Sequence, residues 1–127
     1  MNGAVHLPGF PRIASPLSSV LLDQGCFGGA HQAASQLLHD GYHVLDLGVE
    51  RIQPLAAAIR AELTPQFDLE SWRRQGGAKD LRVQDAWRWS QPVAELALLP
   101  EVLELLALLW GRRPIPFQTL NFPVGTQ

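Results

Sequence analysis

Two histidines, His39 and His43, are four positions apart, a spacing that on one continuous helix lets both imidazoles bind one metal ion. Asp40 follows the first of them and places a carboxylate nearby. Gly41, however, is typical of the position just after a helix ends, and a helix that stops there cannot carry both rings on one face. We therefore interpret both histidines as surface or packing residues. The sequence assigns no metal ligand and no catalytic residue.

A second group of polar side chains lies in IPFQTLNF, residues 115–122. The branched and aromatic residues of this stretch predict a strand, in which Gln118 and Asn121 carry amides that can hydrogen-bond a bound ligand. Side chains alternate between the two faces of a strand, so these amides face opposite ways unless a β-bulge lies between them. Two interpretations stay open. Either at least one amide lines a cavity, or the strand has one polar side that faces solvent.

A third group lies in LRVQDAWRWS, residues 81–90, where Trp87 and Trp89 stand among charged side chains. Tryptophans in such a connection can form a lid over a substrate entrance. The alternative, which we favour, is that they anchor the connection on the core, because aromatic side chains dominate core burial. In that alternative, Asp85 pairs with an arginine.

The helices that position these groups are indicated by their start and stop signals. Pro54 fits only the first turn of a helix, so the helix that contains it should start near Arg51. Ser90 is a good N-cap for the helix that follows it. Helices are predicted over residues 30–40, 51–64, 90–99 and 100–111, with a short helical turn over residues 69–73.

Two further segments complete the chain. Tyr42–Leu47 is rich in strand formers and follows a helix stop, which predicts a short strand. Residues 1–30 hold several prolines and glycines without sustained periodicity, and we interpret them as an extended or loose arm. Residues 31–127 then form the main domain. Its apolar helix over residues 100–111 needs to be covered on most sides.

Composition limits the classes of partner. The 127 residues carry a formal net charge of -2 and no cluster of lysine and arginine, so we expect no nucleic-acid partner. Glutamates and a proline interrupt the longest apolar stretch, residues 93–110, so we expect no membrane span. The one cysteine, Cys26, excludes an internal disulfide, and a cytoplasmic location is the expectation.

In order along the chain, LLHDGYHVLDLG, RVQDAWRWS and LLWGRRPIPFQTLNFPVGTQ resemble the N-terminal half of the phytanoyl-CoA dioxygenase family, over roughly residues 35–127. The most specific part is residues 111–126. The resemblance implies an α+β fold in which a helical part precedes the first strand or strands of a double-stranded β-helix, or jelly roll, here incomplete. It also implies a small organic substrate, Fe(II) held by two histidines and a carboxylate, and 2-oxoglutarate and oxygen as co-substrates.

The resemblance also carries expectations for single residues. It implies cofactor binding by Gln118 and Asn121, and substrate binding by Arg82 and Trp87 near the entrance. The family's first metal ligands form a His-x-Asp motif one strand later, and none of the four histidines here is followed by that pattern. We therefore expect a fragment that is inactive alone and binds neither Fe(II) nor 2-oxoglutarate by itself.

The alternative is a non-catalytic helical domain that binds a protein partner. Its contact surface would be the helix over residues 100–111 together with the terminal strand. An exposed strand edge pairs readily with another chain, so self-association through that edge is a further expectation.

Overall fold

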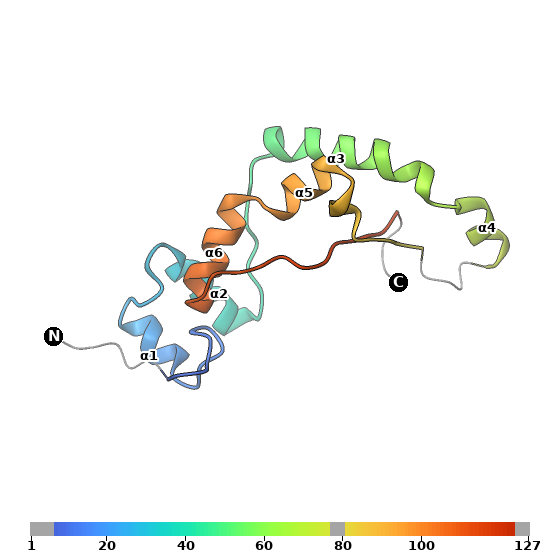
Figure 1. Ribbon diagram of the computed structural model, residues 1–127. Helices are drawn as coiled ribbons and strands as arrows, with labels where there is room; N and C mark the ends of the chain where they lie inside the picture. The colour runs from blue at the N-terminus through green and yellow to red at the C-terminus, as the bar shows by residue number, and fades with distance from the viewer. Residues whose placement is uncertain (1–6, 77–80, 124–127) are drawn as a thin grey trace. The chain divides into compact units, whose positions relative to one another are not determined.

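The structure is a computed structural model that describes residues 7–76 and 81–123. These residues form helices and one small two-stranded antiparallel sheet, which makes the chain α+β (Figure 1). The chain divides into two compact units, each described by itself below. The first unit comprises Met1–Asp46 and Pro100–Ile115, and the second comprises Leu47–Leu99 and Pro116–Gln127.

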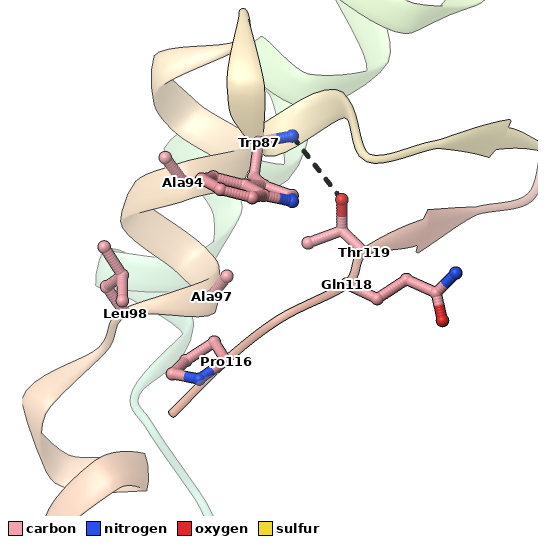
Figure 2. A pocket seen from close by; sticks show the side chains of 7 residues that line it. All are labelled: Trp87, Ala94, Ala97, Leu98, Pro116, Gln118 and Thr119. Carbon is pink, nitrogen blue, oxygen red and sulfur yellow. Dashed lines mark hydrogen bonds between the residues drawn. The ribbon is translucent and has the colours of Figure 1, made fainter. Parts of the chain in front are cut away.

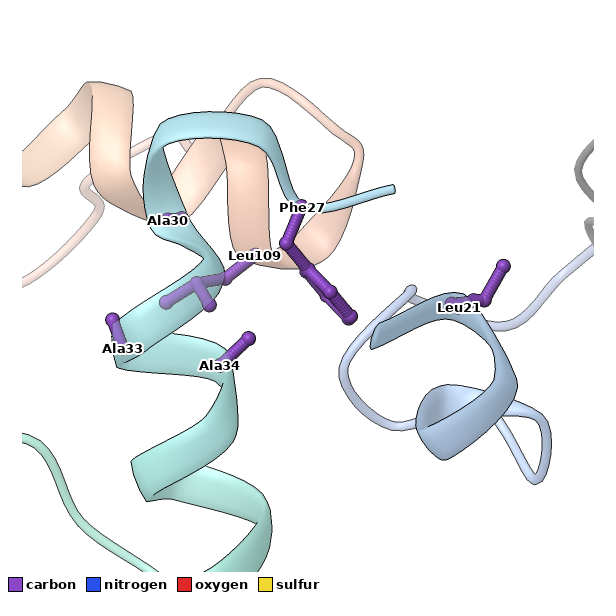
Figure 3. Close-up of a cluster of buried hydrophobic side chains, with 6 residues drawn as sticks. All are labelled: Leu21, Phe27, Ala30, Ala33, Ala34 and Leu109. Carbon is purple, nitrogen blue, oxygen red and sulfur yellow. The ribbon is translucent and has the colours of Figure 1, made fainter. Parts of the chain in front are cut away.

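The first unit is helical. Its core is a cluster of buried apolar side chains around Phe27, whose ring lies between the alanines of α2 and Leu21 of α1 (Figure 3). Small alanines on α2 let the ring approach the helix closely, and Leu109 of α6 packs against the same cluster. The elements of this unit are α1 (Ser18–Asp23), η1 (Gly28–Ala30), α2 (His31–Asp40) and α6 (Pro100–Trp110).

The prediction of an extended or loose arm over residues 1–30 is wrong for the residues that the structure describes. Ser18–Asp23 is a helix, and Phe27 is fully buried. The backbone N–H of Ile13 donates to the carbonyl oxygen of Leu109 at 3.0 Å, and that of Arg12 donates to Trp110 at 3.2 Å. These bonds satisfy carbonyl groups at the C-terminal end of α6 that have no partner within the helix. Residues 1–6 lie outside the described part.

The second unit packs helices around a smaller core of Leu63, Ala86 and Val93, with Ile59 and Phe67 against it. Its sheet consists of two short strands whose register pairs Val83 with Asn121 and Gln84 with Leu120. The elements of this unit are α3 (Val49–Leu63), η2 (Thr64–Gln66), α4 (Leu69–Arg74), β1 (Val83–Gln84), η3 (Ala86–Arg88), α5 (Gln91–Ala97) and β2 (Leu120–Asn121).

The signals for helix ends are largely confirmed. Gly41 closes α2 in the left-handed conformation, with φ of 81°. Ser90 is the N-cap of α5, and its side chain accepts a hydrogen bond from the backbone N–H of Val93 at 3.4 Å. The last helix begins at Pro100 and is followed by Gly111, with φ of 65°. The predicted helical turn over residues 69–73 is α4.

Three expectations need correction. Tyr42–Leu47 is not a strand, because strand formers need a partner strand and this exposed segment has none among the described residues. The helix that contains Pro54 begins at Val49, so this proline lies in the second turn, where its ring is exposed. The predicted strand over residues 115–122 is limited to Leu120–Asn121, because β1 offers only two residues to pair with it. No helix within residues 7–76 and 81–123 is long and apolar enough to cross a membrane.

Candidate functional site

The second unit holds a small pocket between α5 and residues 116–119, with a volume of about 70 Å³ (Figure 2). Ala94, Ala97 and Leu98 form one wall, because residues three and four positions apart lie on the same face of a helix. The other lining residues are Trp87, Pro116, Gln118 and Thr119. The wall is therefore mainly apolar, with one amide and one hydroxyl.

The pocket exists because two distant segments are hydrogen-bonded to each other. The backbone N–H of Asp85 donates to the carbonyl oxygen of Thr119 at 2.8 Å, which continues the ladder between β1 and β2 by one position. The backbone N–H of Trp87 then donates to Thr119 Oγ1 at 3.4 Å (Figure 2). These bonds hold the indole of Trp87 beside the segment that carries Gln118.

Asp85 is unusual in two respects. It is the only non-glycine residue with positive φ in the described part of the chain, with φ of 54°. Its Oδ1 atom is shielded from solvent and accepts no hydrogen bond within residues 7–76 and 81–123. The expected pairing with an arginine is therefore not observed at this oxygen. Buried polar atoms almost always have a partner, so this one calls for an explanation.

The tryptophans do not anchor the connection as the favoured alternative predicted. The exposed fraction is 38% for Trp87 and 54% for Trp89, and the small side chain of Ala86 is buried instead. The tight turn of η3 directs Ala86 into the core, and the larger neighbours remain at the surface. The guanidinium carbon of Arg88 lies 5.3 Å from the centroid of the Trp87 ring, within the range of a cation–π contact.

Of the four residues expected to bind ligands, two line the pocket and two do not. Trp87 and Gln118 line the same pocket, and Figure 2 shows the amide end of Gln118 extending away from α5. Asn121 does not line it; its Nδ2 atom donates to the carbonyl oxygen of Val83 at 3.4 Å. Arg82 is exposed and does not line it either.

The sequence interpretation missed the helical wall and Thr119 as pocket residues. The i, i+3, i+4 stripe of Ala94, Ala97 and Leu98 was a usable signal for one apolar face. Nothing local indicated which segment would lie against that face, because the partner is residues 116–119. The two segments are 32 residues apart where Trp87 bonds to Thr119.

The size and lining of the pocket limit its chemistry. Its volume of about 70 Å³ is several times smaller than that of a typical ligand pocket. None of its lining side chains can act as a general acid or base. As it stands, the pocket can receive one small apolar group, with the Gln118 amide at its border.

The iron that the resemblance implies does not fit the described residues. Within residues 7–76 and 81–123, no three His, Cys, Asp or Glu side chains lie close enough together to hold a metal ion. His39 Nδ1 is 2.6 Å from Asp40 Oδ1, and His43 Nδ1 is hydrogen-bonded to Gln36 Oε1. The hydrogen bond with the Asp40 carboxylate, and then its charge, raise the pKa of the exposed His39 imidazole.

No family model, curated protein sequence or solved structure matches the chain. The likeness to the phytanoyl-CoA dioxygenase family therefore rests on the residues quoted above. What the site can do follows from its own geometry.

Proposed function

We propose that this chain supplies the helical N-terminal portion and the substrate entrance of an Fe(II)- and 2-oxoglutarate-dependent oxygenase similar to the phytanoyl-CoA dioxygenases. The β1–β2 pair would then belong to the start of the jelly roll, and a small organic substrate would enter beside it. The metal ligands are not assigned to any described residue. The proposal therefore covers binding and positioning, and it contains no step at iron.

The observation that supports this proposal best is the meeting of two of the segments that carry the resemblance. RVQDAWRWS and IPFQTLNF are joined by the Asp85–Thr119 backbone bond of 2.8 Å and by the two-residue ladder. The bond from Asn121 Nδ2 to the Val83 carbonyl oxygen spans 38 positions of sequence. A shared ligand site needs such a meeting, since neither segment could form a pocket alone.

The proposal assigns a different role to each of the four residues. Gln118 borders the pocket and its amide end extends away from α5 (Figure 2), so the proposal assigns this amide cofactor contact on the side of the segment that faces away from the helix. Asn121 uses its amide to join the strands, and we assign it that positioning role. Trp87 forms the wall of the entrance. Arg82 lies outside the pocket lining, where its charge can attract an acidic substrate before binding.

The first test is to read the transcript beyond the codon for Gln127. The proposal expects an open frame with a His-x-Asp or His-x-Glu motif within about a dozen codons, which leaves room for one short turn. A stop codon at that point, with a stable and soluble protein of this length, would contradict the proposal.

If the frame continues, the whole protein gives a second test through turnover of 2-oxoglutarate to succinate. We expect Gln118→Ala to raise KM for 2-oxoglutarate about tenfold, the loss of about one hydrogen bond to a charged group. The matched control is Phe117→Ala, because this neighbouring side chain is 81% exposed and does not line the pocket. Equal effects of both variants would remove Gln118 from the cofactor site.

The alternative, a partner-binding domain, is supported by exposed apolar side chains and by the edges of the sheet. Apolar side chains remain at the surface around the short strand β2, with Phe117 81%, Leu120 43% and Phe122 43% exposed. The buried residue of α6 is Leu109, and Trp110 remains 39% exposed. A two-stranded sheet also leaves outer edges that a second copy could extend.

Sedimentation of the chain tests this alternative, which expects a dimer that Leu120→Lys converts to monomer, since edge charges oppose strand pairing. Val44→Lys is the control, because this side chain is 76% exposed and lies outside the sheet. A monomer at all concentrations would exclude self-association as the function of the edge.

A further inference from the structure

We draw no further inference here: the strongest candidate, the apolar pocket between α5 and residues 116–119 together with the buried Oδ1 atom of Asp85, belongs to the candidate site already described, and nothing in the described part of the chain shows what would bind there.

Discussion

The side chain of Arg12 lies across Gly111, just beyond the end of α6. A Cβ atom at Gly111 would stand 2.8 Å from Arg12 Nε and 3.1 Å from its Cγ and Cδ atoms. The same arginine donates from Nη1 to the carbonyl oxygen of Cys26 at 3.2 Å. One side chain thus connects the end of α6 to the turn that precedes Phe27, and it requires a residue without a side chain beneath it.

Gly111→Ala should consequently cost more stability than the same change at Gly41. Both glycines have positive φ, of 65° and 81°, but Gly41 has no atom within 4 Å of the added Cβ. We expect Gly41→Ala to lower the free energy of unfolding by about 1–2 kcal/mol through backbone strain alone. Gly111→Ala should lose about 1 kcal/mol more, because the arginine must move and give up its bond to Cys26.

A double-mutant cycle measured by urea unfolding isolates this contact. In an Arg12→Ala background, Gly111→Ala should cost no more than Gly41→Ala does. If the difference between the two glycines persists without the arginine, the crowding at Gly111 has another source.

Phe27→Ala tests whether residues 7–30 belong to the core of the first unit. The ring is fully buried among small side chains, so its removal should lower the free energy of unfolding by about 3–5 kcal/mol. Phe10→Ala is the matched control, since that ring is 48% exposed and should contribute under about 1 kcal/mol. Urea unfolding followed by circular dichroism gives both values. If Phe27→Ala and Phe10→Ala both lower the free energy of unfolding by under about 1 kcal/mol, residues 7–30 would again be interpreted as a loose arm.

Helix limits could be predicted from the sequence, whereas the burial of Phe27 could not. Gly41, Ser90 and Pro100 act on the backbone within one or two turns, so the limits of α2, α5 and α6 could be predicted from local chemistry. The burial of Phe27 depends on Ala33 and Ala34 and on Leu109, which is far away in sequence. No local period indicates such packing.

In the candidate site, too, local features could be predicted from the sequence and long-range contacts could not. Trp87 and Gln118 could be selected from residue type and resemblance, and they do line one pocket. The β1–β2 pair could not be predicted, because a strand of two residues, Val83–Gln84, has no recognisable pattern of its own. Asp85 carried no signal at all, since only coordinates reveal a left-handed backbone and a carboxylate oxygen without a partner.

Ser90→Ala should destabilise α5. The Ser90 side chain is fully buried and accepts the bond from Val93 N–H that begins the helix. We expect a loss of about 1 kcal/mol in the free energy of unfolding, and a smaller loss for Ser90→Gly, because glycine is itself a tolerable N-cap. Thermal unfolding of both variants checks the order. If Ser90→Gly lowers the free energy of unfolding more than Ser90→Ala does, the space that the side chain fills matters more at this position than the cap.

The His39–Asp40 pair predicts a pH dependence that NMR can follow. Because the folded-state pKa of His39 is raised, the pair contributes stability that is fully present below the unfolded-state pKa and is lost as pH rises through the folded-state value. Asp40→Asn should lower the titration midpoint of the His39 ring. Both side chains are exposed, 87% and 45%, so salt should weaken the effect.

Asp68→Asn serves as the reference for this titration, because the Asp68 carboxylate is bonded within its own helix. It should leave the His39 midpoint unchanged. A midpoint that is the same in the unaltered chain and in Asp40→Asn would show that the two side chains do not interact in solution.

The hydrogen bonds from Arg12 and Ile13 to the end of α6 have a consequence for the order of folding. The first unit is assembled from early and late parts of the chain, so the contacts of α6 within it are long-range in sequence, and forming them costs chain entropy. On the ribosome, α1 and α2 emerge long before α6 is synthesised. Phe27 must therefore wait in a partly open cluster, and chaperone binding or aggregation at this stage competes with the arrival of Leu109.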